Sequence, residues 1–315
     1  ISAYYILKGR DLPFARRSFA IAASFGMAAI LSVIVLGDES GYEVGEVQRV
    51  KLAAIEAEWH TEPAPAAFTA VGFPNQETMH TDYAVKIPYL MGIIATRSLD
   101  EEVTGIRDLV KEHEVRIRNG MVAYALLEKL RAGDETPETR EQFEATKGDF
   151  GYGFLLKRYT DKVVDATEEQ IIAASFDSIP TVAPMFWSFR LMVGCGVIML
   201  FVFAAAFWQS TRHKIAEKKW VLRAALYSLP LPWIAIEAGW FVSEFGRQPW
   251  TISEVLPTFM SASSLTPADL WFSIISITVF YTILLVIEAF LMFKFARLGP
   301  SSLKTGRYHF ETQDA

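Results

Sequence analysis

The sequence predicts an all-α integral membrane protein, a transmembrane helix bundle with a large extracytoplasmic, mainly helical loop domain. Apolar residues make up 51% of the 315 residues, and the mean hydropathy is +0.23. Several runs reach the roughly 20 apolar residues that a helix needs to cross a bilayer. Because 21% of the residues are nevertheless charged, the charge must be concentrated in the segments between these runs.

The apolar runs predict the transmembrane helices. Residues 1–17 are expected to be the end of a truncated transmembrane helix and a cytoplasmic turn, so we expect the chain to begin partway through a longer protein. Five runs with charged flanks make buried helices of a soluble core a poor alternative. Four complete transmembrane helices are predicted, at residues 18–37, 182–211, 224–244 and 270–293.

The charged flanks predict the orientation of these helices. If the helices alternate in direction, the basic clusters within residues 8–17, 212–223 and 294–307 share one side. The positive-inside rule makes that side cytoplasmic. The sequence therefore predicts a cytoplasmic loop at 212–223, a cytoplasmic tail at 294–315, and periplasmic segments at 38–181 and 245–269.

The segment 38–181 is expected to have a structure of its own. It holds 15 basic and 27 acidic residues, and it is too long for a structureless connection in a compact protein. Apolar spacing predicts helices within 48–59 and 103–130. The sequence from Thr167 to Gln170 fits a capping box that opens a further helix. Taken alone, these helices are typical of a solvated cap.

Composition excludes several functional classes. A net charge of −6 argues against a basic nucleic-acid-binding protein, so no nucleic acid is expected as a partner. The single Cys195 excludes a disulfide scaffold, a cysteine zinc site and c-type heme attachment. All five histidines lie outside the predicted transmembrane helices, and none has a metal-ligand spacing with another. No glycine-rich phosphate loop or serine nucleophile motif is present.

Ionisable residues inside transmembrane helices are costly and are functional candidates by default. Arg190, Glu237 and Glu288 are the three in this sequence. Glu237 and Glu244 project within about 20° of each other on a helix. With Trp240 and Arg247 they place two carboxylates, an indole and a guanidinium on one face. Membrane-interface anchors would account for Glu244 and Arg247, but not for Glu237, which lies about two turns deeper.

Two other pairs are weaker candidates from spacing alone. Met192 offers a thioether, a soft ligand for heme iron, although most methionines serve packing. Arg190 and Met192 point about 200° apart on a helix, so they do not share one face. Lys51 and Glu56 are five residues apart and do not form a helical ion pair. Their surroundings are equally typical of a solvated helix surface.

Four long strings in the sequence carry a family resemblance. They are GDESGYE at 37–43, KLAAIEAEW at 51–59, GWFVSEFGRQPW at 239–250 and FKFARLGPSSLKTGRYHFE at 293–311. These strings resemble subunit I of cytochrome bd ubiquinol oxidase. The resemblance runs over all 315 residues and is close to the enterobacterial branch.

The resemblance implies a quinol:dioxygen oxidoreductase of the bacterial inner membrane. Members of the family oxidise ubiquinol or menaquinol at the periplasmic side and reduce dioxygen to water. They build a proton gradient without pumping protons. The implied cofactors are a low-spin heme b, a high-spin heme b and heme d. The implied partners are a homologous membrane subunit II and one or more small single-span accessory subunits.

The resemblance also assigns roles to residues near the implied hemes. Met192 matches the methionine ligand of the low-spin heme b iron, and Arg190 matches an arginine near that heme. Glu244 matches the glutamate associated with the high-spin heme b iron. Trp240 and Arg247 match residues that line the heme cluster.

The quinol site is implied to lie in the segment 38–181, which corresponds to the family's Q-loop in its long form. Lys51 and Glu56 match the pair of residues at that site. Glu56 is expected to accept a quinol proton as a general base, and Lys51 to hydrogen-bond a ring oxygen.

One departure and two alternatives accompany this interpretation. The family subunit has about nine transmembrane helices, and its histidine heme ligands are expected before Ile1, so the fragment alone is expected to be inactive. A cyanide-insensitive variant with heme b in place of heme d fits these residues equally well. A membrane scaffold or channel subunit would instead use Glu237 and Glu244 to line a water-filled path. Met192 discriminates between the oxidase and the channel, because a channel has no use for its sulfur.

Overall fold

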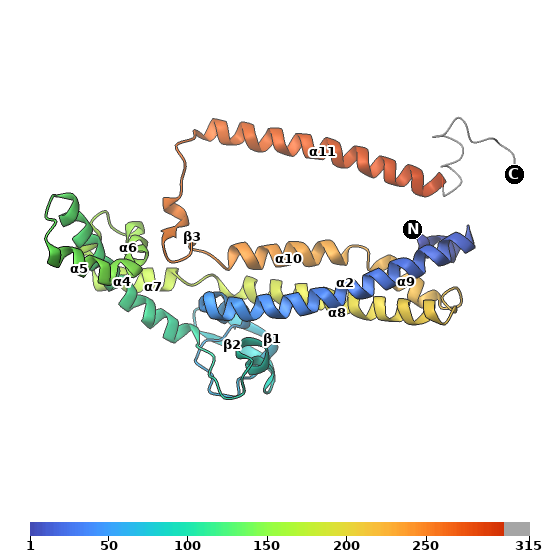
Figure 1. The fold of residues 1–315 in the computed structure, drawn as a ribbon, viewed down its shortest axis with the longest axis horizontal. Helices are drawn as coiled ribbons and strands as arrows, with labels where there is room; N and C mark the ends of the chain where they lie inside the picture. The colour runs from blue at the N-terminus through green and yellow to red at the C-terminus, as the bar shows by residue number, and fades with distance from the viewer. Residues whose placement is uncertain (299–315) are drawn as a thin grey trace. The chain divides into compact units, whose positions relative to one another are not determined.

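The computed structural model describes residues 1–298, and these residues form two compact units (Figure 1). The first unit comprises residues 1–25, 204–227 and the chain from Ser263 onward; the second comprises 26–203 and 228–262. Two long helices, α2 (Leu12–Val47) and α8 (Val182–Thr211), contribute residues to both units.

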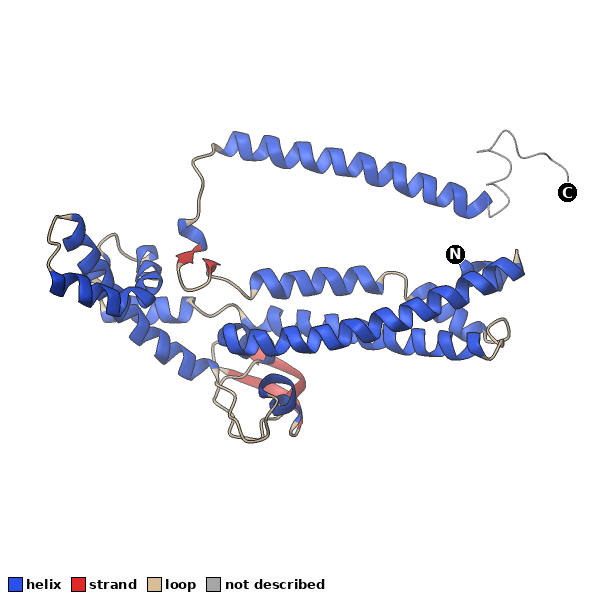
Figure 2. Cartoon of the chain, viewed as in Figure 1, coloured by secondary structure: helices blue, strands red, loops and turns tan. Residues whose placement is uncertain are grey.

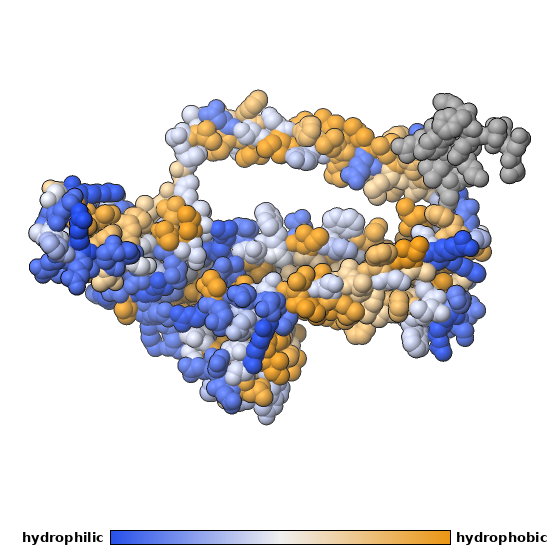
Figure 3. All heavy atoms as spheres, viewed as in Figure 1, coloured by the Kyte–Doolittle hydropathy of each residue, from blue (hydrophilic) through white to orange (hydrophobic). Residues whose placement is uncertain are grey.

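Within residues 1–298, four helical segments are long and apolar enough to cross a membrane. They are α2, the segment Glu168–Thr211, which contains α8, the segment Lys219–Phe245 and α11 (Pro267–Leu298). In Figure 3 the hydrophobic colour is concentrated along α11, and that helix has no buried residue among those described. Helices satisfy their own backbone hydrogen bonds, which is why they are suited to lipid. Helices also dominate Figure 2, and the predicted all-α integral membrane fold is confirmed.

The segment Lys219–Phe245 consists of two helices, α9 (Lys219–Tyr227) and α10 (Leu231–Phe245). Pro230 and Pro232 stand at the start of α10. Proline has no backbone N–H and its ring clashes with the preceding turn, so two prolines this close interrupt the ladder of helical hydrogen bonds. The range 224–244, predicted as one helix, therefore contains a break.

The first unit has a small core of its own. Helix α1 (Ser2–Lys8) packs with the start of α2, the end of α8 and α9 through Tyr5, Phe19, Val221 and Leu222. The Tyr5 hydroxyl donates a hydrogen bond to the Ala296 carbonyl of α11, at 2.6 Å.

The predicted Q-loop lies in the second unit and is mostly helical. Its capping box is confirmed, because the Thr167 hydroxyl and the Gln170 side chain each accept from the other's backbone N–H. The helices predicted within 48–59 and 103–130 are also present, as α3 and α4. The α-helices of the loop are α3 (Arg49–Glu56), α4 (Ile106–Arg131), α5 (Pro137–Thr146), α6 (Phe150–Leu155) and α7 (Glu168–Asp177). Shorter helical turns are η1 (Gly92–Thr96), η2 (Lys147–Asp149), η3 (Leu156–Arg158) and η4 (Val163–Asp165).

Two small antiparallel hairpins interrupt the helical pattern. Strands β1 (Phe68–Asn75) and β2 (His80–Ile87) pair in the Q-loop, and β3 (Trp250–Ile252) pairs with β4 (Leu256–Pro257) after α10, before the turn η5 (Thr258–Met260). The Asn75 side chain accepts from the backbone N–H groups of Glu77 and Thr78 and so closes the first turn. This hairpin was not predicted, because helical periodicity does not report strand pairing.

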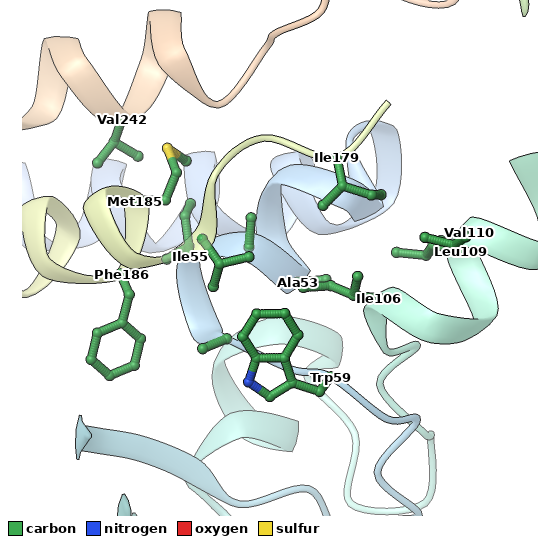
Figure 4. Packing of buried hydrophobic residues seen from close by; sticks show 13 residues of the cluster. Ala53, Ile55, Trp59, Ile106, Leu109, Val110, Ile179, Met185, Phe186 and Val242 are labelled. Atoms are coloured by element: carbon green, nitrogen blue, oxygen red, sulfur yellow. The ribbon is translucent and has the colours of Figure 1, made fainter. Parts of the chain in front are cut away.

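A buried apolar cluster fixes α3 against α4, α8 and α10. Figure 4 shows Trp59, Ile55 and Ile106 gathered beside Phe186 and Met185 of α8. At the C-terminal end of α10, a Cβ on Gly246 would lie 2.4 Å from Met185 Cε and 2.9 Å from Lys51 Cγ. Only a glycine allows α3 to approach this closely, which positions Lys51 at the end of α10.

The far part of the Q-loop is built on a second close approach. A Cβ on Gly120 would lie 2.4 Å from the Gly153 backbone nitrogen, so α4 and α6 cross backbone to backbone. The apolar cluster around this crossing includes Ile117, Tyr152 and Trp250. Since Trp250 belongs to β3, the hairpin that follows α10 is fixed to the Q-loop.

Candidate functional site

Lys51 lies on α3 against the last turn of α10. The residue is 8% exposed. Burial lowers the pKa of its ammonium group; Arg247 lowers it further, and Glu244 acts in the opposite direction. Arg247 is itself within 3.3 Å of Glu244, between Nη1 and Oε2. The structure therefore brings Lys51, Glu244 and Arg247 together, although they lie almost 200 residues apart in the sequence.

Glu56 faces the opposite way from Lys51 and forms a buried ion pair. Arg190 Nη2 donates to Glu56 Oε2 at 2.9 Å, with 10% and 5% of the two side chains exposed. Burial raises the pKa of Glu56 to about 7, while the charge of Arg190 and its hydrogen bond lower it. A carboxyl poised near neutral pH suits proton transfer at physiological pH.

Arg190 uses all its donors within the protein. Nε donates to the Ala70 carbonyl at 3.1 Å, Nη1 to the Ile55 and Phe186 carbonyls at 2.7 and 3.2 Å, and Nη2 also to the Thr69 carbonyl. The guanidinium carbon lies 3.3 Å from the centre of the Phe186 ring. These contacts attach α8 to the Q-loop, so Arg190 anchors the loop as well as Glu56.

Helix α10 carries Glu237, Trp240 and Glu244 of the predicted stripe, and Arg247 lies two residues beyond its end. All four are exposed in the described chain, with Trp240 at 65%. Arg247 Nη2 donates to the Thr251 carbonyl at 2.5 Å, which holds the guanidinium at the C-terminal end of the stripe. An exposed stripe of this chemistry on a membrane helix leaves polar groups that require further partners.

Met192 lies on α8 and packs against α10 at Gly239. A Cβ placed on Gly239 of α10 would lie 2.9 Å from Met192 Sδ. The absence of a side chain at Gly239 therefore leaves room for the sulfur beside α10. Met192 is thus brought next to the residue that precedes Trp240, while Arg190 points to the Q-loop, as the 200° separation predicted.

A polar cavity of about 300 Å³ opens beside Lys51. Its walls come from α3, α4, α6, the end of α10 and the following hairpin. Three arginines on or beside it are paired with carboxylates: Arg49 with Glu112, Arg116 with Glu254 and Arg247 with Glu244. Lys51 and His113 also line it. Glu56 is not among its lining residues, so the two predicted quinol residues face different surroundings.

His113 belongs to a buried hydrogen-bond network that sequence reasoning did not identify. Its Nδ1 lies 2.6 Å from Ser178 Oγ, and its Nε2 lies 3.4 Å from the Tyr152 hydroxyl. Burial lowers the pKa of His113 to about 4, so the ring is neutral at physiological pH. No local sequence motif predicts this network, because its members come from α4, α6 and the end of α7.

Arg116 ties this network to the hairpin after α10. Its Nη1 and Nη2 donate to both carboxylate oxygens of Glu254 at 2.8 and 2.9 Å, and Nη1 also donates to the Tyr152 hydroxyl at 3.0 Å. Its Nε donates to Asp149 Oδ1 at 2.7 Å. A bidentate arginine–carboxylate pair is geometrically specific as well as strong, so the wall of the cavity is rigidly held.

Glu58 is a second buried carboxyl, and it was not among the site residues predicted from the sequence. It is 6% exposed and lies two residues after Glu56. Burial raises its pKa to about 8; Glu62 and Glu56 raise it further, and Lys86 lowers it. The string KLAAIEAEW contains both glutamates, but helical spacing alone gave no reason to expect the second one to be buried.

No group of three or more His, Cys, Asp or Glu side chains within residues 1–298 is arranged to hold a metal ion. The described histidines are His60, His80, His113 and His213, while His309 lies outside the described residues. Much of the string at 293–311 and of the predicted tail at 294–315 also lies outside them.

Comparisons with known proteins agree with the strings quoted above. A family model described as cytochrome bd terminal oxidase subunit I matches residues 1–300. The cytochrome bd-II ubiquinol oxidase subunit 1 of Escherichia coli (strain K12) is 50% identical over 305 residues, which is 97% of this chain. The cytochrome bd ubiquinol oxidase subunit 1 of Bacillus subtilis (strain 168) is 30% identical over 315 residues, the full chain.

The chain spans just over half the length of these relatives, 59% of the first and 54% of the second. The match nevertheless covers nearly all of this sequence, including the Q-loop and every predicted site residue. The chain therefore belongs to the cytochrome bd terminal oxidase subunit I family.

Proposed function

We propose that this chain is part of a terminal oxidase that takes electrons from ubiquinol or menaquinol and reduces dioxygen to water. The family match supports this reaction class. The observation that carries the proposal is the position of Lys51. It is buried on α3 and lies against Glu244 and Arg247 at the end of α10, so the quinol residue of the Q-loop adjoins the residues assigned to the heme cluster.

The residues of α8 and α10 fit a heme. Met192 supplies a thioether sulfur, a known axial ligand of heme iron, and Gly239 leaves space beside it. Glu244 supplies a carboxylate for a second iron, and Trp240 and Arg247 supply an aromatic face and a cation. When bound, hemes would supply one-electron transfer and dioxygen chemistry. We assign a low-spin heme b to Met192, a high-spin heme b to Glu244 and heme d to the same cluster.

Lys51 and Glu56 divide the work on the quinol. The Lys51 ammonium donates a hydrogen bond to a ring oxygen and so holds the ring at the end of α10. Glu56, with a pKa of about 7, accepts a proton as a general base. Arg190 favours the return of Glu56 to its charged form, so the proton moves on rather than staying on the carboxyl.

The arrangement in the membrane completes the proposal. The basic flanks support a position of the Q-loop on the periplasmic side of a bacterial inner membrane. Quinol protons are then released outside while water formation consumes cytoplasmic protons, which builds a gradient without a pump. We propose a homologous membrane subunit II and small single-span subunits as partners, in keeping with the large exposed apolar surface of α11.

A reduced-minus-oxidised optical spectrum tests the proposal. Membranes would carry the full-length subunit with its partner subunits, and oxygen uptake would be measured with a short-chain ubiquinol. We expect a red-shifted chlorin band beside b-type bands. If the spectrum contains b-type bands alone and oxygen uptake depends on quinol, the protein is the cyanide-insensitive variant. Correctly inserted protein without heme bands would overturn the oxidase and favour a channel or scaffold lined by Glu237 and Glu244.

A further inference from the structure

The cavity beside Lys51 has an unusual balance of charges. Arg49, Arg116 and Arg247 are each matched by a carboxylate, as described above. Of the titratable side chains that line the cavity, Lys51, His113 and Tyr152 are left outside these ion pairs. An occupant would therefore meet a cationic donor on one wall and a neutral imidazole on another.

The hydrogen bonds around His113 fix which ring nitrogen carries the proton. The Ser178 hydroxyl donates to the Ser175 carbonyl at 2.5 Å, so its oxygen accepts from His113 Nδ1–H at 2.6 Å. In the neutral ring the other nitrogen, Nε2, is then an acceptor. The lowered pKa of His113 agrees with a neutral ring. Ser178 therefore acts as a positioning residue that presents an acceptor toward the cavity.

The partner of Nε2 is weakly held. The Tyr152 hydroxyl lies 3.4 Å from Nε2, which is longer than a good hydrogen bond. The same hydroxyl accepts from Arg116 at 3.0 Å and lies 3.2 Å from Glu254 Oε1, to which it donates. Tyr152 is thus committed to the Arg116–Glu254 pair, and Nε2 remains available for a better donor.

We propose that this cavity binds the quinol ring, with Lys51 donating to one ring oxygen and His113 Nε2 accepting a hydrogen bond from the other hydroxyl. The inference rests on the proposed quinol oxidation and adds a residue to it. A volume of about 300 Å³ lies at the lower end of small-molecule pockets, which suits one ring without its tail. Glu56 does not line this cavity, so its proposed role as a base does not involve direct contact with a ring bound here.

Two substitutions of His113 that are similar in size test which of its ring nitrogens contributes to quinol binding. In His113→Gln the amide reaches the position of Nε2 and supplies an acceptor there, whereas in His113→Asn it ends near Nδ1. Apparent KM for a short-chain ubiquinol would be measured in the full-length assembled oxidase. We expect a KM within about two-fold of the parent for His113→Gln and about ten-fold higher for His113→Asn, the effect of one lost buried hydrogen bond. Dithionite-reduced heme bands should be unchanged in both.

The controls separate this contact from general damage. His80→Asn and His80→Gln alter an exposed histidine of β2 and should leave KM unchanged. Tyr152→Phe removes the weak competitor for Nε2 together with the hydroxyl's contacts to Arg116 and Glu254, while the bidentate Arg116–Glu254 pair remains. KM should therefore equal the parent value or fall, and this variant tests the inference if the His113 variants do not assemble. A raised KM in Tyr152→Phe, or equal KM values in His113→Gln and His113→Asn, would overturn the inference.

The two proposals fail in different ways. A parent complex that inserts but takes up no oxygen with quinol would refute the proposed function. A fully active parent whose His113→Gln and His113→Asn variants share one KM would refute only the role of His113.

Discussion

Arg190 on α8 and Glu56 on α3 form a buried ion pair, with 2.9 Å between Nη2 and Oε2. The pair joins a transmembrane helix to the Q-loop, and four backbone carbonyls hold the same guanidinium. A residue proposed to take a quinol proton is therefore also part of what keeps the loop on the membrane helices. Stability and catalysis should both respond to changes at this pair.

Glu56→Leu should destabilise the protein far more than Glu56→Gln. Leucine leaves the Arg190 charge buried without its partner, which costs about 3–5 kcal/mol. Glutamine keeps the volume and accepts the same hydrogen bond from Arg190. Thermal unfolding of the purified complex in detergent would compare the two variants. Equal unfolding temperatures for Leu and Gln would show that the ion pair contributes nothing beyond packing.

Lys51→Ala should raise the apparent KM for quinol or lower kcat while all heme bands remain. The ammonium is proposed to bind a ring oxygen, so its loss weakens substrate binding and not the hemes. Lys111→Ala, on the exposed side of α4 with a 74% exposed side chain, is the matched control. Artificial electron donors that bypass quinol should work normally. An equal loss with those donors would remove Lys51 from the quinol site.

Met192→Leu in the full-length subunit should abolish the low-spin heme signal while the subunit still inserts. Gly239→Ala should perturb the same signal, since its Cβ would lie 2.9 Å from Met192 Sδ and displace the sulfur. Gly194→Ala on α8 meets no atom within 4 Å and serves as the control. Optical spectra of the reduced membranes provide the measurement. An unchanged spectrum for Met192→Leu would contradict the ligand assignment.

Gly153→Ala should destabilise the Q-loop. A Cβ at this position would lie 2.7 Å from the Gly120 carbonyl carbon and oxygen, and such overpacking costs about 1–3 kcal/mol. Gly148→Ala, which meets no atom within 4 Å, should be close to neutral. Limited proteolysis of the segment 38–181 in the assembled protein would compare the cleavage rates. Identical rates for the two variants would argue against the close crossing of α4 and α6.

Glu58→Gln should change how stability depends on pH. Burial raises the pKa of Glu58 to about 8, so the folded state keeps a proton that the unfolded state releases above about pH 4.5. The contribution of Glu58 to the free energy of unfolding is therefore fully present at low pH and is lost as the pH rises toward 8. When the pH rises from 5.5 to 7.5, the free energy of unfolding of the variant should increase by on the order of 2 kcal/mol relative to that of the parent.

Thermal unfolding of parent and variant at these two pH values would test this expectation. The parent and the variant both retain Glu56, so the comparison isolates the change made at position 58, including its effect on the neighbouring Glu56. Parallel pH profiles for the two proteins would mean that Glu58 is ionised and solvated in the folded state.

Hydropathy and local spacing determined much of the fold from the sequence. Apolar runs long enough to cross a bilayer are visible without tertiary information, because lipid contact acts on each helix separately. The capping box at Thr167 and the helix at Ile106–Arg131 are also local features, and both are present. The hairpin of β1 and β2 was missed, since its pairing depends on an asparagine turn and not on helical periodicity.

The sequence also named the site residues, partly from charges within the predicted transmembrane helices and partly through resemblance. Their contacts were decided by the tertiary structure. Lys51 and Glu56 are five residues apart on one helix, and packing sends one to the end of α10 and the other to Arg190. Long-range packing alone joins His113, Tyr152 and Glu254 around one cavity. Burial then sets their protonation, because desolvation depends on every neighbouring element and not on the order of residues in the chain.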